Sequence, residues 1–354
     1  MKSFKSIILA ALCAIACSCG GGDTGYVLVT GYAQGGNYSV KVNLLSDDGT
    51  VLADPASVKA DIDAILSGIE NSVSGYRSES LISKFNAGES IVPDSAFLDL
   101  YRISRHFHTL SGGAFDAAAA PLFDIWGFGF TEDKMPSDSL VAAVLVSCGM
   151  DRLVDDAASM VSADGKLSPE LLVREGKALP KLNFNAVAQG YSCDVVAAYL
   201  HSIGSHDMLI NVGGEMFCEG HNPDGELWTI GIDRPVESND GSHVDLYGTY
   251  RVGGAPCGVV TSGNYRKFYY RDGVKYSHTV DPRTGRPVVM SLLSATIVAG
   301  DAASADALAT CCMVMGLDDA RTFIQSLPDV EACFLYEEDG DIKAWTSEGF
   351  QLLR

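Results

Sequence analysis

The stretch from Tyr276 to Thr310 is the part of the chain that most constrains its fold. It begins with YSHTVDPRTGRP, which lies on and after an expected strand, and continues to SADALAT, which lies in an expected helix. In that helix Asp306 and Thr310 stand four residues apart, so both lie on one face, one turn from each other. A carboxylate and a hydroxyl are oxygen ligands of the kind that Mg²⁺ prefers, and Mg²⁺ often holds phosphates. The segment therefore predicts a strand, a turn and a metal-binding helix, with His278 beside the turn.

Apolar residues elsewhere follow helical and strand spacing in irregular alternation, without repeats. Expected helices cover 58–73, 96–110 and 187–203, and the last two end at glycines. Expected strands cover 208–212, 227–232, 274–280, 292–298 and 332–337, and 341–353 is expected to form a closing hairpin strand. This order predicts an α+β fold, in which mixed sheets are covered by helices within a single large domain.

The N-terminus is typical of an export signal. A basic start with Lys2 and Lys5 precedes an apolar run, 7–16, that is too short to span a bilayer as a mature helix. Two cysteines follow small residues, as in a bacterial lipoprotein signal whose cysteine becomes lipidated. Cys19 is favoured because residues 15–18 fit a lipobox and three glycines follow it, while Cys17 remains the alternative. An ordinary cleaved signal peptide is a second alternative.

These features divide the chain into three parts. Residues 1–19 are expected to be the signal peptide, 20–30 a short tether and 31–354 the folded domain. The protein is then an exported lipoprotein, anchored to a bacterial membrane by its lipid and facing the periplasm.

The formal net charge of −20 excludes one class of partner. Binding nucleic acid through its phosphates needs a positive surface, so no nucleic acid is expected. A phosphate-rich ligand would need a metal ion or local backbone donors. The ten cysteines contain no CxxC spacing, which argues against zinc and thiol-redox sites. Buried free thiols are expected, and one or two disulfides stay open.

Several separated motifs have ordinary structural explanations when each is taken alone. In SGYRSESLISKFN (74–86), Ser78 or Ser80 can cap a helix. In SGGAFDAAAAPLFDIWGFG (111–129), Phe115, Trp126 and Phe128 can form walls for a flat ring or a plain aromatic core. The glycine-rich or asparagine-rich segments GYAQGGNYSVKV (31–42), KLNFNAVAQGYSCD (181–194), NVGGEMFCEGHNPDGELWTIGI (211–232) and VVTSGNYRKFYY (259–270) can form turns and helix starts.

Taken together, these motifs resemble the ApbE-type FAD:protein FMN transferases, from about Gly31 to the C-terminus. The resemblance implies a T-fold-like domain with FAD as substrate and Mg²⁺ as cofactor. It implies that the metal is held by the Ala186 carbonyl, Asp306 and Thr310, and that His278 serves in transfer. The residues implied to contact FAD are Gln34, Tyr76, Ala114, Phe115, Asp116, Asn183, Gln189 and Val280.

The chain departs from the family pattern at some of these positions. Gln34 stands in a methionine place, Asn183 in an aspartate place and Gln189 in a lysine place. The last two replace a charge by an amide that can still form hydrogen bonds. Glu215, in the middle of a strand pair, is expected to be structural. Arg283 can stabilise the negative charge of a phosphate, or it can be a surface residue of a turn.

The implied reaction is transfer of FMN from FAD to a threonine or serine hydroxyl of an acceptor redox protein, with release of AMP. The acceptor would carry a short Ser/Thr-containing flavinylation motif. One alternative is a Mg²⁺-dependent FAD pyrophosphatase that gives FMN and AMP. The other is an exported FAD-binding lipoprotein without turnover, for which His278, Asp306 and Thr310 would be unnecessary.

Overall fold

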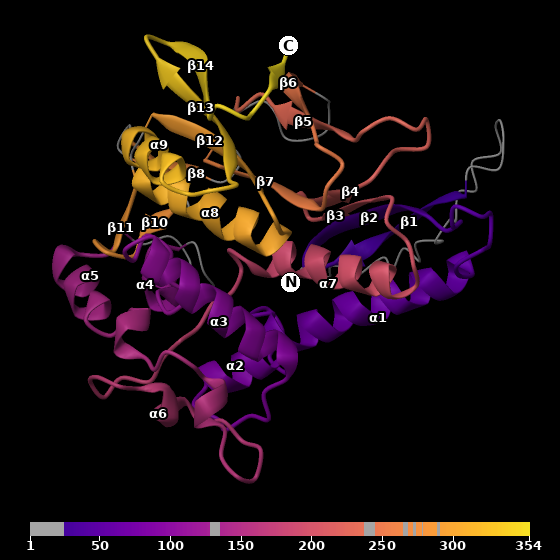
Figure 1. The fold of residues 1–354 in the computed structure, drawn as a ribbon. Helices are drawn as coiled ribbons and strands as arrows, with labels where there is room; N and C mark the ends of the chain where they lie inside the picture. Colours follow the sequence, from indigo (N-terminus) through magenta and orange to yellow (C-terminus); the bar gives the residue numbers. More distant parts are fainter. Residues whose placement is uncertain are drawn as a thin grey trace, which may run out of the picture.

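An antiparallel sheet of eight strands forms the middle of the molecule (Figure 1). In spatial order its strands are β1 (Tyr26–Ala33), β2 (Gly36–Asn43), β3 (Met208–Val212), β4 (Glu215–Glu219), β7 (Cys257–Gly263), β12 (Leu292–Ala299), β13 (Glu331–Glu338) and β14 (Asp341–Thr346). The computed structural model describes residues 25–127, 135–236, 245–264, 268–271, 274–277, 279–288 and 291–354. The predicted sites at Cys17, Cys19 and His278, and the aromatic ring of Phe128, lie outside these ranges.

Smaller sheets complete the β structure. A three-stranded sheet has the order β15 (Leu352–Leu353), β6 (Leu246–Arg251) and β5 (Thr229–Asp233). Two further pairs are β8 (Phe268–Arg271) with β9 (Val274–Ser277), and β10 (Val280–Asp281) with β11 (Arg286–Pro287).

The helices follow the chain in two groups. The first group is α1 (Pro55–Val73), α2 (Leu81–Asn86), α3 (Ser95–Leu110), α4 (Ala120–Ile125), α5 (Asp138–Leu145) and α6 (Pro169–Leu172), with the 3₁₀ turns Met150–Arg152 and Ala158–Met160. The second is α7 (Ala188–Ser202), α8 (Ala302–Met315) and α9 (Leu317–Gln325). In Figure 1, α2 to α6 gather at one side of α7 and α8, away from the small β5–β6 sheet.

Both faces of the large sheet are covered where β7, β12 and β13 run side by side. Val260, Ile297 and Phe334 pack into the core beneath the helices. Their neighbours Val259, Val298, Cys333 and Leu335 pack on the opposite face, against Trp228, Ile230 and Tyr250 of the small sheet. Alternate residues of a strand point to opposite faces, so the doubly covered parts at 259–260, 297–298 and 332–335 are continuous apolar runs. The predicted α+β fold in a single large domain is confirmed.

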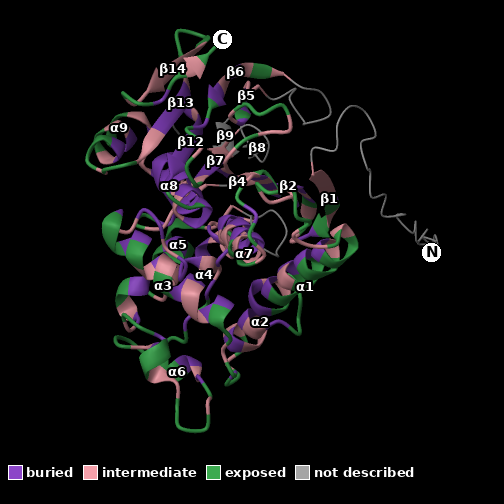
Figure 2. Ribbon diagram, turned by 45° about the vertical axis from the view of Figure 1, so that its right-hand side comes forward, coloured by how far each residue is buried: buried purple, intermediate pink, exposed green. Residues whose placement is uncertain are grey.

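Helix α8 lies in the centre of this arrangement. Most of its residues are buried, and it is purple almost throughout in Figure 2. It packs against β7, β12 and α7. A helix that is apolar on all sides belongs in a core, so a polar residue on it is costly unless it has a partner or a function.

Local signals explain where the helices begin. The side chain of Asp54 accepts a hydrogen bond from Ser57 N–H at the start of α1, and Ser80 caps α2 through Ser83 N–H, as predicted. The expected helices at 58–73, 96–110 and 187–203 correspond to α1, α3 and α7, and the expected strands at 208–212, 292–298 and 332–337 to β3, β12 and β13.

Several boundaries differ from the predictions. The expected strand at 227–232 is β5, which begins at Thr229, and the expected strand at 274–280 covers β9 and the start of β10, which belong to different sheets. Strand β1 begins at Tyr26, inside the expected tether 20–30, because residues 26–33 pair along their whole length with β2. The C-terminal segment is divided between two sheets: β14 pairs with β13, whereas β15 pairs with β6. The part of the tail after β14 therefore closes the small sheet.

The seven cysteines within the described ranges are free thiols, and most are buried, as expected from the sequence. None of the helices in this part of the chain has both the length and the apolar character that a bilayer crossing requires.

Candidate functional site

Asp306 and Thr310 lie one turn apart on α8, as their spacing predicts. The Asp306 residue is 5% exposed, and Thr310 is half-buried. The side chain of Asp301 caps the start of the helix by accepting a hydrogen bond from Ser304 N–H. Asp306 is therefore not needed as a cap, and its burial calls for another explanation.

The start of α7 supplies a direct partner for Asp306. The Gly190 N–H donates to Asp306 Oδ2 across 3.2 Å, although in a regular helix it would bond to the carbonyl four residues earlier. That carbonyl belongs to Ala186, and no N–H group of the described residues donates to it. Its oxygen is thus available at the point where α7 meets α8.

Glycine at position 190 makes this meeting possible. A Cβ atom there would lie 2.3 Å from the Ala302 carbonyl oxygen and 2.9 Å from Ala303 Cα. The two helices are further joined by Asp194, whose carboxylate accepts hydrogen bonds of 2.8 Å from the N–H groups of Ala302 and Ala303. Close contact between the helices holds Asp306 beside the first turn of α7.

A second carboxylate acts on Asp306 from the sheet. Burial raises the pKa of Asp306 well above its ordinary value of 3.8, and the negative charge of Glu215 at the start of β4 raises it further. Asp306 is buried and Glu215 is half-buried, and two such neighbouring carboxylates cannot both be ionised cheaply unless a cation balances them. Asp306, Glu215, the Thr310 hydroxyl and the Ala186 carbonyl offer only oxygen ligands, which suits Mg²⁺. The residues present therefore fit the expected metal.

Two hairpin tips approach the same place. The β1–β2 turn consists of Gln34 and Gly35, both with positive φ angles (51° and 78°), which is the geometry of a tight two-residue hairpin. The Gln34 amide donates to Ser192 Oγ on α7 across 2.5 Å. A Cβ atom at Gly36 would be 3.3 Å from Gly213 Cα in the β3–β4 turn. The predicted FAD contact Gln34 thus lies beside α7.

Gln189 reaches the β3–β4 turn from the other side. A Cβ atom at Gly213 would lie 2.0 Å from Gln189 Nε2 and 3.4 Å from Glu215 Oε2, so a larger residue would displace the end of the Gln189 side chain. Gly213 also has a φ of 71°, which favours glycine. The predicted cofactor residue Gln189 and the predicted structural residue Glu215 are consequently neighbours at the candidate metal site.

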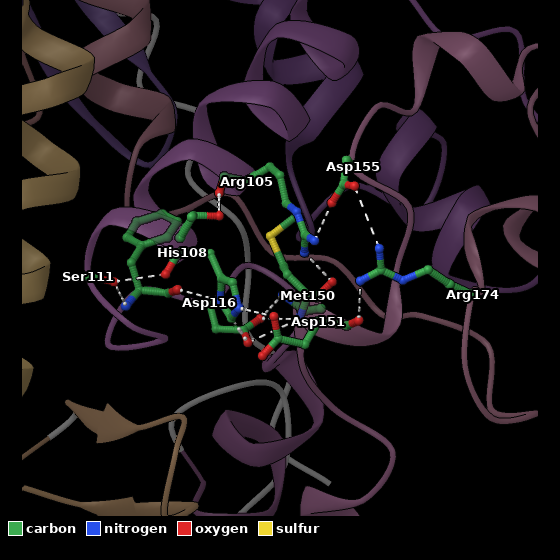
Figure 3. Close-up of polar contacts among 11 residues, drawn as sticks. Arg105, His108, Ser111, Asp116, Met150, Asp151, Asp155 and Arg174 are labelled. Atoms are coloured by element: carbon green, nitrogen blue, oxygen red, sulfur yellow. Dashed lines mark hydrogen bonds and ion pairs between the residues drawn. The ribbon is translucent and has the colours of Figure 1, made fainter.

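Asp116, the last residue of the SGGAFD motif, lies in a dense polar network (Figure 3). Its carboxylate accepts hydrogen bonds from the N–H groups of Ala118 (2.8 Å) and Met150 (3.1 Å), and its Oδ2 lies 3.3 Å from His108 Nδ1. The other ring nitrogen of His108 lies 3.1 Å from Asp151 Oδ1. Asp116 therefore orders the turn that carries Ala114 and Phe115.

His108 is the residue of this network that sequence reasoning missed. Burial lowers its pKa, but hydrogen bonds and charge from Asp116 and Asp151 outweigh burial, so the net pKa is raised above 6.5. The partners are 8 and 43 residues away along the chain, at positions 116 and 151. Only the proximity of His108 to the SGGAFD motif, at the end of the preceding expected helix, could have drawn attention to it.

Ala114 and Phe115 are almost fully buried, with 1% and 2% exposure. The Phe115 N–H donates to Ser111 Oγ (3.0 Å), and the Phe115 carbonyl lies 3.0 Å from His108 Nδ1. Trp126 is also buried, and its Nε1–H donates to the Gly285 carbonyl across 2.7 Å. The N–H groups of residues 111–115 are all bonded within the protein, so the part of this turn that a ligand can reach is the exposed Gly112 and the half-buried Gly113.

The segment that follows His278 packs against the same region. Val280 is buried with Trp126 in a small apolar cluster. Arg283 forms a two-pronged ion pair with Asp281, with Nε–Oδ1 and Nη2–Oδ2 distances of 2.9 and 3.0 Å. A Cβ atom at Gly113 would be 3.5 Å from Arg283 Cγ. The SGG turn and the PRTG turn are therefore in contact.

Asn183 and Tyr76 are the remaining predicted cofactor residues. The Asn183 N–H donates to the Ala117 carbonyl, and its side chain accepts a hydrogen bond from Asn185 N–H, both at 2.8 Å. Asn183 thus ties the approach to α7 to the run of alanines after Asp116. Tyr76, in the turn before α2, is 73% exposed.

A hollow of about 220 Å³ also touches α8, but on another face. Ser304 and Leu308 line it, and each lies two residues from Asp306, which is roughly half a turn around the helix. The candidate site is therefore defined by its oxygen ligands and glycine-rich turns and not by this hollow.

Comparisons with known proteins agree with this geometry. The model of the ApbE family matches residues 35–334. The chain is 30% identical over 331 residues to the FAD:protein FMN transferase of Vibrio cholerae serotype O1. This alignment covers 92% of each protein. It is 29% identical over 304 residues to the FAD:protein FMN transferase of Escherichia coli K12, covering 84% of this chain and 81% of that protein.

Solved structures are similar over almost the whole chain. The structure of the flavin transferase ApbE from Vibrio cholerae has a TM-score of 0.74 and 28% identity, covering 91% of this chain and 97% of that one. The apo structure of the Pseudomonas stutzeri flavinyl transferase ApbE has a TM-score of 0.76 and 29% identity, covering 91% and 95%.

Proposed function

The chain belongs to the ApbE family, and we propose that it transfers FMN from FAD to a threonine or serine hydroxyl of an acceptor protein, releasing AMP. Its curated relatives are FAD:protein FMN transferases, so this chain is a transferase that moves a flavin from FAD to a protein. Use of Mg²⁺, the acceptor hydroxyl and the release of AMP are our proposal. The observation that carries it is the pair of carboxylates formed by buried Asp306 and half-buried Glu215 at the meeting point of α7, α8 and two hairpin tips.

We propose that Asp306, Thr310 and the Ala186 carbonyl hold Mg²⁺, with Glu215 adding negative charge nearby. When bound, the ion would neutralise negative charge that develops on the pyrophosphate oxygens. The chain carries a formal net charge of −20, so this local provision for a cation supports binding of a phosphate-rich substrate. The Gly190 N–H keeps the Asp306 carboxylate oriented toward the first turn of α7.

The FAD site is proposed to extend from the metal toward the SGGAF turn. Gln34 lies at the tip of the β1–β2 hairpin, and the Gln189 side chain reaches the β3–β4 turn from α7, so both amides are placed to form hydrogen bonds with a ligand. Ala114 and Phe115, which are buried, would support the exposed glycines of the same turn against FAD. The complete set of proposed FAD contacts is Gln34, Tyr76, Ala114, Phe115, Asp116, Asn183, Gln189 and Val280.

The proposed reaction is an in-line displacement at the phosphorus atom of the FMN half. The acceptor oxygen forms a bond to phosphorus, the phosphorus–oxygen bond to AMP breaks, and AMP leaves with the bonding electrons. The hydroxyl proton is proposed to pass to His278, because an imidazole has a pKa near neutrality and serves as a general base. The next two residues, Thr279 and Val280, are anchored by a hydrogen bond to Asn264 Oδ1 (2.8 Å) and by burial.

The acceptor and the location are proposed from the sequence. The acceptor would be an exported or membrane-bound redox protein with a short Ser/Thr-containing motif. The signal-like residues 1–19 support a lipoprotein that is anchored to a bacterial membrane through Cys19, or through Cys17, and faces the periplasm.

The test combines the purified chain with FAD, Mg²⁺ and an acceptor domain that carries the threonine motif. In-gel flavin fluorescence and intact mass then detect a covalent FMN adduct, and chromatography measures AMP. We expect an adduct and one AMP per adduct, both abolished by EDTA and by Asp306→Asn.

The other outcomes separate the alternatives. Free FMN and AMP without an adduct would indicate a pyrophosphatase. Unchanged FAD with several acceptor domains would indicate a binding protein. A His278→Ala variant that forms adduct at the wild-type rate would remove the proposed role of His278.

A further inference from the structure

Two histidines and a glutamate meet at the ends of α7 and β4 that are remote from the candidate site. His201 lies in the last turn of α7, His206 in the loop that leads to β3, and Glu219 at the end of β4. Gln189, in the first turn of α7, is 12 residues from His201, which corresponds to about 18 Å along a helix. The cluster is therefore separate from the site at Asp306.

The side chains of this cluster already converge. His201 Nε2 lies 2.5 Å from Glu219 Oε2, and His206 Nδ1 lies 3.2 Å from Glu219 Oε1. One ligand atom from each residue can be chosen so that all three lie within 4.8 Å of one another. The two imidazole rings are stacked, with centroids 5.1 Å apart and an angle of 24° between their planes.

We propose that His201, His206 and Glu219 bind a divalent transition-metal ion of the Zn²⁺ type. Two imidazole nitrogens and a carboxylate oxygen are a ligand set that Zn²⁺ accepts, with a fourth position left for water. Zinc–ligand distances of about 2.0–2.2 Å put ligand atoms about 3.3 Å apart in a tetrahedral site. The observed N–O separations of 2.5 and 3.2 Å lie at or below that value, so the side chains need only move slightly apart to admit the ion.

The surrounding structure holds the carboxylate and leaves a path for the ion. The Glu219 side chain is 12% exposed, and the carbonyl of the same residue accepts a hydrogen bond of 2.9 Å from Trp228 Nε1. The His206 side chain is 67% exposed, so it can turn toward an incoming ion. In the same loop Ser205 Oγ donates to the Asn43 carbonyl across 2.8 Å, which fixes the backbone beside His206.

The ligand chemistry separates this site from the one proposed for Mg²⁺. Imidazole nitrogens suit zinc and its neighbours, whereas Mg²⁺ prefers oxygen ligands in an octahedral arrangement. An ion at Glu219 would join the C-terminal end of α7 to the β3–β4 hairpin, because His201 and Glu219 belong to those two elements. Binding to the folded state alone would raise thermal stability.

The experiment titrates the full chain with Zn²⁺ by calorimetry, after metal removal by EDTA and dialysis and in the presence of excess Mg²⁺. We expect one Zn²⁺ per chain and a rise in Tm. The His206→Asn variant should lose at least about tenfold in affinity and most of the rise in Tm. This substitution is at an exposed side chain, so it should fold normally. Glu219→Gln should give the same loss.

Two variants serve as controls. His106→Asn removes an exposed histidine on α3, outside the cluster, and should bind Zn²⁺ as the wild type does. Asp306→Asn should also keep the zinc site. Wild-type affinity in His206→Asn, an equal loss in His106→Asn, or no saturable binding at all would each overturn the proposal and leave the cluster as a hydrogen-bonded His–Glu–His contact.

Discussion

The backbone N–H of Gly190 donates to Oδ2 of Asp306 across 3.2 Å, which joins the first turn of α7 to the middle of α8. Because this N–H is used for a side chain of another helix, the Ala186 carbonyl one turn earlier receives no N–H from the described residues. One hydrogen bond thus orients the carboxylate and frees a carbonyl oxygen beside it. Both features are what a site for a hard cation requires.

Asp306→Asn is expected to separate stability from activity. The metal-free variant should be more stable than the metal-free wild type, because it removes the buried carboxylate that lies near the charge of Glu215. FMN transfer should fall by at least about 100-fold, since charge on the pyrophosphate would no longer be balanced. Thermal unfolding in EDTA and in Mg²⁺, together with the adduct assay, measures both effects.

Asp318→Asn is the matched control, because this carboxylate is 94% exposed on α9. It should change neither property. Equal Mg²⁺-induced changes in Tm for wild type and Asp306→Asn would contradict a metal site at Asp306.

Gly190→Ala is expected to destabilise the protein by at least about 2 kcal/mol. The added Cβ would lie 2.3 Å from the Ala302 carbonyl oxygen, and backbone cannot rotate away as a side chain can. Helices α7 and α8 would have to separate, which would also weaken FAD binding. Urea unfolding measures the loss.

Gly68→Ala in α1 provides the comparison, since nothing lies within 4 Å of a Cβ at that position. This exchange should stabilise the helix by about 0.5–1 kcal/mol. If the two alanine variants changed stability alike, close helix contact would not be the reason for glycine at position 190.

Trp126→Phe is expected to cost about 1–3 kcal/mol, because the buried Gly285 carbonyl would lose the N–H of the indole ring. Gly285 lies between β10 and β11, just after the predicted catalytic segment. Transfer should therefore slow more than FAD binding weakens. Single-turnover adduct formation and FAD titration distinguish these effects, and equal losses in both would argue against a link between Trp126 and the transfer step.

Local spacing predicted the parts of the site that lie within one element. Asp306 and Thr310 are on one helical face because the interval is four residues, and the apolar periods predicted α1, α3 and α7 closely. The resemblance to a known family brought Ala186 and Gln189 into the same site. Such neighbours can be predicted because helical periodicity or a family motif specifies their positions directly.

Contacts between distant segments were beyond such reasoning. The pairing of β15 with β6 depends on which sheet edge is left open after β14 turns back, not on the residues of the strand itself. The proximity of Glu215 to Asp306 arises because β4 and α8 pack together across 91 positions of the sequence, from 215 to 306. The His108 network likewise needs α3 and the 3₁₀ turn at Met150 to be adjacent.

His108 is expected to make the stability of the protein depend on pH. Its folded pKa is raised above 6.5 because hydrogen bonds and charge from Asp116 and Asp151 outweigh the effect of burial. The folded state therefore binds the proton more tightly than the unfolded state, so the stabilisation is complete below pH 6.5 and is lost as pH rises through the folded pKa.

His108→Gln removes this titration. The free energy of unfolding, measured in urea at about pH 6 and about pH 9, should fall less between these values in the variant than in the wild type. His106→Gln is the matched control, because it removes an exposed histidine two residues earlier in the same helix and should keep the wild-type difference. A wild-type pH dependence in His108→Gln would mean that the two aspartates hold the SGGAF turn without a proton on His108.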